Sequence, residues 1–399
     1  MKKLLYVVFL LMAVFTISSM RVVFKQYYES AAYSPWSIIM TLALTLCGIV
    51  ALLTFDINAP RRTTLNKLVL LLWLYSLAMF VITMETTLST KNPTKIFLNV
   101  SLWESVYFLF FCFAHKEKDT LRYSSIFFTL LFIPVTFYFL KSNNLRMALT
   151  LGMTSMGNNM IFYAVLLLPW LLLLKKRSLR TIAVLAVTVL SLLSLKRSAL
   201  IILVVIDVFY FYLEYLSVSK KRLKQTVYGV IFLVAAALLL AYFNERTGSL
   251  AVARMENLSE DEGSGRLERW YEVWDLFSSE ESAALMFFGH GYRAVEQFIG
   301  GEHQTAHNDF LEMMFDYGVV GFVLYLLIHL SIAKRCVQLF KKRSPLRVSY
   351  TISYLLFFAF SMVSHLIIYP TYFAFLVAYW AVVEANEFEK NKIMQVIES

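Results

Sequence analysis

The sequence has little charge. Only 16% of its 399 residues are Asp, Glu, Lys or Arg, whereas 59% are apolar. A soluble domain of this length needs far more charge to stay in solution, so the composition excludes that class and predicts a polytopic membrane protein. Cysteine is scarce as well, because Cys47, Cys112 and Cys336 are the whole set and their spacing matches neither a disulfide pattern nor a zinc site. We therefore expect no disulfide and no zinc site, and we expect no cofactor.

Long apolar runs dominate the chain. A helix that crosses the hydrocarbon core of a membrane needs about 20 mostly apolar residues. Runs bounded by charged residues predict about 12 such helices, near 4–20, 36–55, 68–84, 96–113, 123–140, 160–174, 181–195, 198–215, 227–243, 319–333, 348–368 and 371–385. Only Lys196 and Arg197 separate the seventh run from the eighth, which indicates either a tight turn or a break in one long helix. The predicted fold is an all-α polytopic membrane protein with one large extracytoplasmic loop between helices 9 and 10.

The basic residues predict the orientation. If Met1 is cytoplasmic, the inner loops hold 24 of the 37 Lys and Arg residues, and five of the other 13 lie in the segment 244–306. The positive-inside rule counts short loops, so the contrast that matters is 24 to 8, and it places both termini in the cytoplasm. The net charge of +10 then reflects topology and attraction to anionic lipid, and it does not indicate a nucleic-acid partner.

The segment 244–306 is the main polar interruption of the chain, and it holds seven of the 13 glycines. An amphipathic helix is predicted over 267–277, because apolar residues recur there at spacings of three and four: Leu267, Trp270, Tyr271, Trp274 and Phe277. Its aromatic face favours the headgroup layer, so we expect this helix to lie on the membrane. The predicted organisation is transmembrane helices 1–9 in 1–243, an extracytoplasmic loop with a catalytic motif in 244–318, and helices 10–12 with a cytoplasmic tail in 319–399.

Two histidines stand where this loop meets the next apolar run. His303 and His307 are four residues apart, which would put both on one face of a helix. The residue after His303 is Gln304 and not the glutamate of the zinc-binding His-Glu-x-x-His pattern, and no third ligand is evident, so a metal site is disfavoured. Asn308 or His307 could simply cap a helix over 309–317 that ends at Gly318. A capping role for Asn308 does not exclude catalysis by His307.

Basic residues occur where phosphate groups could bind. Arg266, Arg269 and Arg293 lie in the polar loop, and a guanidinium fork suits a phosphate, although most charges of this acidic loop are expected to form surface pairs. Lys196 and Arg197 lie at the predicted outer membrane face, where topology disfavours cations. They either extend to the lipid headgroups or bind a ligand.

Two carboxylates, Glu104 and Asp207, fall near the middle of predicted helices, where ionisable residues are costly and frequently functional. One interpretation is a proton relay, which would favour a transporter. The other is a hydrogen bond between helices, to Asn99, Ser101 or a tyrosine. Because no cation accompanies the two acids inside the membrane, the case for transport is thin.

The motifs between about 190 and 330 resemble those of the O-antigen ligase/polymerase superfamily, and the helix count and loop placement of the whole chain fit it as well. The matching elements are Ser194-Leu195-Lys196-Arg197-Ser198, Gly265-Arg266-Leu267-x-x-Trp270, Gly289-x-Gly291 and His307-Asn308-x-x-Leu311-Glu312-x-x-x-x-x-Gly318-x-x-Gly321. In this family the basic turn usually has an arginine after a small or polar residue. Here Leu195 and Lys196 stand in that place, which makes Lys196 a stand-in candidate beside Arg197.

The resemblance implies a bacterial glycosyltransferase of the cytoplasmic (inner) membrane that acts, on the extracytoplasmic side, on glycans linked to undecaprenyl diphosphate. It implies His307 as the general base toward the acceptor hydroxyl. The residues that would bind the donor diphosphate are cationic: Arg197, Arg266, Lys196, Arg269 and Arg293. Because these cations would stabilise the charge that develops on the diphosphate, no metal ion is required. The implied partners are an acceptor glycolipid, a flippase and a chain-length regulator.

A polymerase and a ligase share this chemistry and differ in the acceptor. A polymerase joins the glycan to another lipid-linked repeat unit, whereas a ligase joins it to lipid A-core. We favour an O-antigen or capsular polysaccharide polymerase, because polymerases are the more numerous and varied group, and the ligase is the alternative. A lipid-glycan flippase or proton-coupled transporter is less favoured, because carriers place their sites at the bilayer midplane and not in a long external loop.

Overall fold

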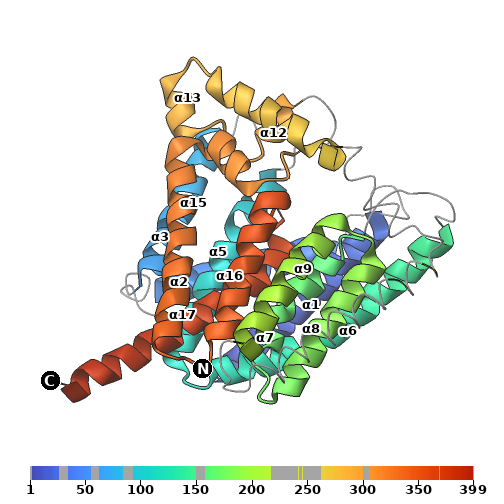
Figure 1. Cartoon of the computed structure of the whole chain (residues 1–399). Coiled ribbons are helices and arrows are strands. Elements are labelled where there is room, and N and C mark those ends of the chain that lie inside the picture. Colours follow the sequence, from blue (N-terminus) through green and yellow to red (C-terminus); the bar gives the residue numbers. More distant parts are fainter. Residues whose placement is uncertain are drawn as a thin grey trace.

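The computed structural model describes residues 2–26, 35–54, 63–83, 93–149, 158–216, 241, 245, 262–299, 305–367 and 369–398. Within these ranges the regular secondary structure is helical, and no strand occurs. Most of the helices run side by side as a bundle, and α12 and α13 lie at one end of it (Figure 1). The prediction of an all-α polytopic membrane protein is confirmed.

The bundle contains the helices predicted from the apolar runs. They are α1 (Lys2–Gln26), α2 (Pro35–Thr54), α3 (Thr64–Ile82), α5 (Pro93–Lys116), α6 (Thr120–Leu149), α7 (Ile161–Leu171), α8 (Arg177–Ser194), α9 (Arg197–Phe211), α15 (Asp309–Lys341), α16 (Arg347–Val363) and α17 (Pro370–Glu398). Among the described residues, eight helices are long and apolar enough to cross a membrane, and α7 and α16 are shorter apolar helices. The predicted run at 227–243 lies almost entirely outside the described residues.

The centre of the bundle is formed by helices that are apolar on every side. All residues of α7 are buried, which follows from a sequence without a charged residue, because a helix that is apolar all round avoids water on each face. Trp170 of α7 donates its indole N–H to the carbonyl oxygen of Phe375 in α17, 3.0 Å away, and stacks on Phe128 of α6. Outer helices such as α2 and α6 instead leave apolar side chains exposed, among them Leu53 and Ile133, as lipid-facing helices do.

The basic turn between α8 and α9 is a hairpin. Leu195, in the left-handed region with a φ of 53°, ends α8, and α9 begins two residues later. The two helices lie side by side: Thr188 Oγ1 of α8 donates to Asp207 Oδ2 of α9 at 2.8 Å, and Arg180 of α8 pairs with Glu214, which lies just beyond the end of α9. Of the two predicted alternatives, the tight turn is right and one long broken helix is wrong. Asp207 also proves to make a hydrogen bond between helices, although to Thr188 and not to the partners expected.

Helix α15 is divided by a glycine. It runs for 33 residues, but Gly318 has a φ of 63° and a ψ of −170°, which no helical residue adopts. The segment 309–317 is therefore a short helix of its own, and the apolar part follows from 319. Both the helix over 309–317 and its end at Gly318 were predicted, and the structure confirms them. The apolar part extends to Lys341, beyond the predicted 333.

A second layer covers one end of the bundle. It consists of α12 (Glu262–Ser278), α13 (Ala283–Phe288) and α14 (Val295–Phe298), packed on the first turns of α15. A small apolar core joins α12 and α14 to α15, with Val273, Val295 and Phe315 fully buried and Trp270 and Phe277 packed against it.

The aromatic face predicted for α12 is divided by this core. Trp270 and Phe277 point into it, whereas Leu267, Tyr271 and Trp274 remain 47%, 70% and 51% exposed. The expectation that all five residues lie on the membrane is thus narrowed to the three exposed ones. Whether these three contact lipid stays a prediction.

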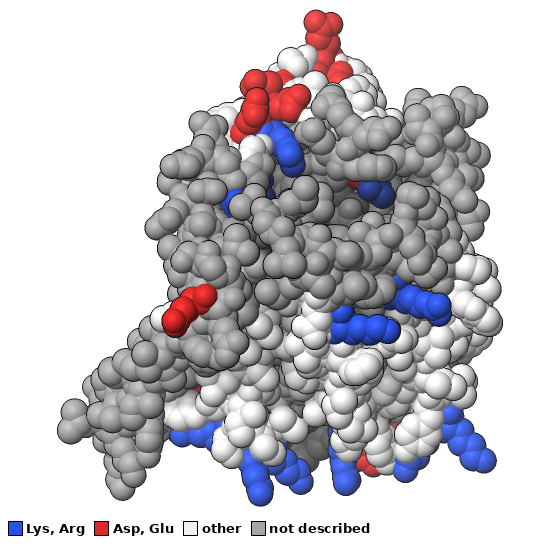
Figure 2. All heavy atoms as spheres, turned by 90° about the vertical axis from the view of Figure 1, so that its right-hand side faces the viewer, with Lys and Arg blue, Asp and Glu red and all other residues white. Residues whose placement is uncertain are grey.

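Charge separates along the bundle. Lys and Arg side chains gather along one end of the molecule in Figure 2, and Asp and Glu side chains gather at the opposite end. Figure 1 marks both chain ends away from α12 and α13. At the basic end, Arg335 forms a two-point ion pair with Glu384 of α17, both contacts 2.7 Å long, and Tyr350 of α16 donates to the same carboxylate. Three helices are thereby held together at this end.

Candidate active site

His307 lies in the segment directly before α15. The helix cap is Asn308, whose side-chain oxygen accepts hydrogen bonds from the backbone N–H groups of Phe310 at 3.0 Å and Leu311 at 3.3 Å. This confirms the predicted cap. His307 has a φ of 53°, which is uncommon for a residue other than glycine and is typical of functional sites. The cap thus explains Asn308 and does not use the imidazole of His307.

Helix α12 brings two of the predicted arginines to this segment. The indole N–H of Trp270 donates to the carbonyl oxygen of Ala306, 2.8 Å away, so α12 is tied to the residue next to His307. Arg266 and Arg269 precede Trp270 within one helical turn, and both side chains are half-buried. The loop and the helix therefore form one structural unit.

The turn between α8 and α9 brings a third cation. Its shape is fixed by hydrogen bonds, because the backbone N–H of Lys196 donates to Ser194 Oγ at 3.0 Å and that of Asn158 donates to the Ser194 carbonyl at 3.0 Å. The ammonium group of Lys196 lies over the ring of Phe162, 5.8 Å from its centre. Arg197 is the first residue of α9, and its predicted contact with diphosphate stays a prediction.

These cations lower the pKa of His307. Burial lowers the pKa of His307 most, and the positive charges of Arg266, Lys196 and Arg269 lower it further, to about 3. At neutral pH the imidazole is therefore uncharged and able to accept a proton. An anion bound among the cations would offset their charge and raise this pKa again. The structure thus brings together four of the six residues predicted for the site: His307, Lys196, Arg266 and Arg269.

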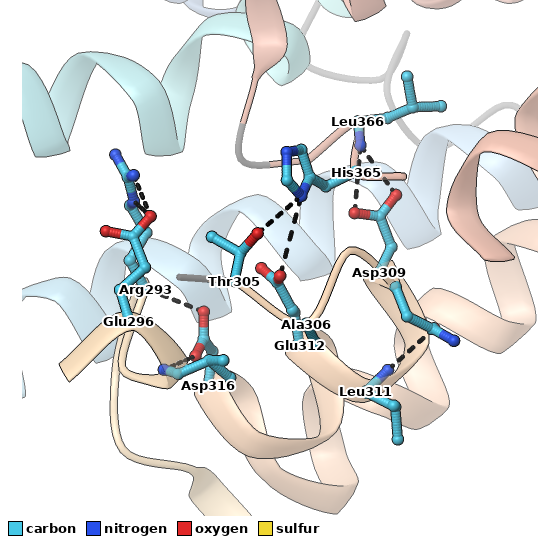
Figure 3. Close-up of polar contacts among 12 residues, drawn as sticks. Arg293, Glu296, Thr305, Ala306, Asp309, Leu311, Glu312, Asp316, His365 and Leu366 are labelled. Carbon is cyan, nitrogen blue, oxygen red and sulfur yellow. Dashed lines mark hydrogen bonds and ion pairs between the residues drawn. The ribbon is translucent and has the colours of Figure 1, made fainter. Parts of the chain in front are cut away.

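Arg293 is placed differently. Its Nε donates to Glu296 Oε1 at 2.6 Å, and its backbone N–H donates to Asp316 Oδ2 at 2.7 Å. The N–H of Val295 donates to the same Asp316 carboxylate at 3.0 Å. Figure 3 shows these contacts beside the first part of α15, residues 309–317, which is called the motif helix below. They tie the loop before α14 to α15, and the predicted role of Arg293 toward diphosphate stays a prediction.

The motif glycines serve the close approach of two backbones. A Cβ atom on Gly289, which has a φ of 85°, would overlap the backbone of Asp316 and Gly318. A Cβ atom on Gly318 would overlap the carbonyl of Phe287. The N–H of Gly291 also donates to the Asp316 carbonyl at 2.8 Å. These glycines allow the loop and the motif helix to approach each other closely.

Sequence reasoning overlooked His365, which lies between α16 and α17. Its ring stacks on that of His307, with the centres 4.6 Å apart and an angle of 19° between the planes. Burial lowers the pKa of His365 well below its usual value, and the charges of His307 and Lys196 add to this. The available signal was a histidine inside a predicted apolar run, and nothing in the sequence paired it with His307.

Among the described residues, no three His, Cys, Asp or Glu side chains gather as metal ligands would. His303, the other half of the spacing discussed above, lies outside the described residues. Glu104 lines a small cavity with Asn99, Tyr292 and Tyr317. Its Oε2 atom is buried, and within the part of the chain described here it accepts no hydrogen bond, so both interpretations of Glu104 stay open.

The fold and site define a multi-pass helical membrane protein with a cation-rich, histidine-containing site at one end of its bundle. Residues 182–326 match the model of the family described as O-antigen ligase. The matched segment runs from α8 into α15 and includes the basic turn, the arginines of α12 and His307, so it confirms the resemblance of this part of the chain to the O-antigen ligase/polymerase superfamily. His365 lies beyond it. Comparison with curated proteins gives no match.

Proposed function

We propose that the protein transfers a glycan from undecaprenyl diphosphate to a hydroxyl group of a lipid-linked repeat unit, as an O-antigen or capsular polysaccharide polymerase of the inner membrane. One observation carries the proposal. A neutral, partly exposed imidazole, that of His307, lies within the field of Arg266, Lys196 and Arg269. This combination suits a reaction that removes a proton from one substrate and leaves negative charge on the other.

The diphosphate is displaced from the anomeric carbon of the donor in one step or in two successive steps. With either route, the acceptor oxygen finally bonds to the anomeric carbon. His307 accepts the proton of the acceptor hydroxyl as that bond forms. A positioned base of this kind contributes about 10² to 10⁴ in rate. The bond between the anomeric carbon and the diphosphate oxygen breaks, and the cations stabilise the departing diphosphate. They supply the positive charge that a metal ion would otherwise supply, so we propose that transfer is metal-independent.

The apolar tail of the donor requires a site beside the membrane. On α12, Leu267, Tyr271 and Trp274 are exposed next to the turn that carries Arg266 and Arg269. Such a surface supports contact with lipid while the diphosphate meets the cations. The basic opposite end of the bundle supports a cytoplasmic location for that end, which would put the site outside.

This orientation can be tested by cysteine labelling. The native cysteines are buried or half-buried, so they should give little background labelling. Exposed Ser279, directly after α12, should label as Ser279→Cys with an impermeant reagent in spheroplasts. Exposed Ser178, in the first turn of α8, should label as Ser178→Cys only after the membrane is opened. The reverse pattern would refute the proposed orientation.

A ligase is the second candidate, because the matched family is described as O-antigen ligase. Its acceptor would be lipid A-core. His307→Ala in cells separates the two. If the protein is a polymerase, single repeat units remain on the core. If it is a ligase, the core is bare and the glycan stays on its carrier.

The matched control is Asn308→Ala, which removes the helix cap. It should cost about 1 kcal/mol of stability and leave substantial activity. Normal glycan lengths with His307→Ala, at normal expression, would show that the proposed function is wrong.

A further inference from the structure

A stripe of apolar residues on α15 ends in a lysine. Four residues follow one another at spacings of four, three and four, and therefore share one face of the helix: Val323, Leu327, Leu330 and Lys334. All four are exposed. In a helix that crosses a membrane, the apolar part of such a face meets lipid. Lys334 lies at its far end, toward the basic end of the bundle that is remote from α12.

This stripe forms one wall of a groove. Helices α3 and α15 lie side by side (Figure 1), and a groove of about 350 Å³ lies between them. Leu65 and Leu68 of α3 line it together with Leu327 and Leu330 of α15. The volume is within the range of sites for small molecules, about 300 to 1,000 Å³. The groove can therefore receive a part of an apolar chain.

One end of the groove is polar. Thr64, the first residue of α3, and Ser331 of α15 bring one hydroxyl group from each wall. Lys334 adds an ammonium group, one helical turn beyond the last leucine of the stripe. A ligand that fits this lining has an apolar chain and, at one end, an anionic group that accepts hydrogen bonds.

A second cation, Arg335, also lines this end and is held in a fixed position. Its Nε and Nη2 atoms donate to Glu384 of α17, and its Nη1 atom donates to Gln338 Oε1, each at 2.7 Å. Tyr350 donates to the same carboxylate at 3.2 Å. A guanidinium has five N–H groups, and these three bonds use three of them. Because Arg335 and Glu384 offset each other, Lys334 supplies the net positive charge of the lining.

We propose that the groove between α3 and α15 binds an anionic phospholipid, with an acyl chain against the leucines of both walls and the phosphate group beside Lys334 and Arg335. Basic pockets between transmembrane helices bind the headgroups of such lipids. A water-soluble anion would gain nothing from the apolar walls, and a lipid without net charge would gain less from Lys334. In the orientation proposed above this end faces the cytoplasm, where the membrane surface is anionic.

The lipid would contact three helices, because Arg335 is itself tied to α17. A ligand that binds the folded state and not the unfolded state raises the stability of the protein as its concentration rises. The lipid site is remote from His307, and neither its binding nor its test requires glycan transfer.

The test uses the purified full-length protein in a neutral detergent. The probes are phosphatidylglycerol and phosphatidylcholine with identical chains, and inorganic phosphate at the same concentration. The thermal midpoint is measured as each probe is added, and native mass spectrometry counts the lipids that stay bound. Phosphatidylglycerol should raise the midpoint more than phosphatidylcholine does. Inorganic phosphate should leave it unchanged, because it has no chain to fill the groove.

Three variants locate the site. Lys334→Gln removes a charge at an exposed position and should weaken phosphatidylglycerol binding about fivefold, which matches the contribution of one lysine near a membrane surface. Ser331→Phe fills the groove and should weaken the binding of both lipids. Lys176→Gln is the matched control, because Lys176 is an exposed lysine just before α8, at the end of that helix remote from Lys196, and does not line the groove. It should bind both lipids as the unmodified protein does.

The opposite results are equally clear. Equal midpoint shifts with the two lipids, or an unchanged preference for phosphatidylglycerol in Lys334→Gln, would overturn the proposal. So would an equal loss in Lys176→Gln, because the preference would then reflect surface charge in general. If inorganic phosphate raised the midpoint as much as phosphatidylglycerol, the groove would be a site for a free anion and not for a lipid. Should Ser331→Phe fold poorly, Lys334→Gln and Lys176→Gln still decide between these outcomes.

Discussion

Trp270 donates its indole N–H to the carbonyl oxygen of Ala306 across 36 positions of sequence, at 2.8 Å. The bond joins the helix that carries two arginines to the residue that precedes the catalytic candidate. Ala306 is fully buried, so no water can replace a lost donor easily. The relative position of the cations and the imidazole therefore depends on this contact.

Trp270→Phe removes the donor and keeps most of the ring. An unsatisfied buried carbonyl costs about 1 to 3 kcal/mol, and we expect α12 to loosen against His307. The KM for the lipid-linked donor should rise and the thermal midpoint in detergent should fall. Trp274→Phe, one turn further along and half exposed, is the matched control and should change neither. Equal effects from both substitutions would contradict the assigned role of the bond.

Arg266 tests the diphosphate site. Arg266→Ala should weaken donor binding as well as turnover, because it removes positive charge from ground state and product alike. Arg266→Lys should restore only part of the loss, since an ammonium group cannot reproduce the two-point contact of a guanidinium. Binding of undecaprenyl diphosphate to the purified variants, measured by tryptophan fluorescence, checks the first effect, and glycan transfer checks the second. Full activity in Arg266→Ala would remove this residue from the site.

The pKa of His307 predicts how stability depends on pH. The pKa is lowered from its ordinary value near 6.5 to about 3, so the folded protein favours the neutral ring. The contribution of the neutral His307 ring to the free energy of unfolding is complete above the pKa of the unfolded state. It is lost as the pH falls from about 6.5 toward 3, by up to about 1.4 kcal/mol per pH unit. The thermal midpoint should thus drop between pH 7.5 and 5.5. His307→Gln should reduce that drop, and an unchanged slope would contradict the assignment.

Gly318 and Gly265 form a natural comparison. Both have positive φ angles, 63° and 67°, but a Cβ atom would meet backbone at Gly318 and open space at Gly265. Gly265→Ala should therefore cost only the left-handed backbone penalty, about 1 to 2 kcal/mol. Gly318→Ala should cost more and also displace the motif helix, with loss of glycan transfer. Thermal midpoints and transfer assays of the two variants test this, and equal behaviour would show that the close approach of the loop to α15 is unimportant.

Local patterns predicted much of the fold and part of the site. The apolar runs predicted the helices because a run long enough to cross a membrane identifies a transmembrane helix by itself. No knowledge of contacts with distant segments is needed. Asn308 and Gly318 were identifiable as cap and terminator from their chemistry alone. The basic turn and α12 pointed to Lys196, Arg266 and Arg269, which the structure brings into the field of His307.

Contacts between distant segments were beyond reach. His365 is 60 residues from Thr305, and an isolated histidine in an apolar run gives no sign of its partner. Arg335 and Glu384 form an ion pair although they are 49 positions apart in the sequence. Counting the charges of a loop does not show which of them pair with a distant helix. The sequence predicted that the whole aromatic face of α12 contacts the membrane. It did not predict the small core around Val273 that buries part of this face, because one valine gives no reason to expect such a core.

The hydrogen bonds from Leu366 to Asp309 connect a residue that begins α15 with one that follows α16. A ribosome makes the arginines of α12 and His307 well before it reaches this partner segment. A half-made or truncated copy that ends after α15 therefore carries the cations and the imidazole of His307 but not the His365 ring that stacks on it. The two stacked rings are therefore complete only after the chain has been made beyond α16.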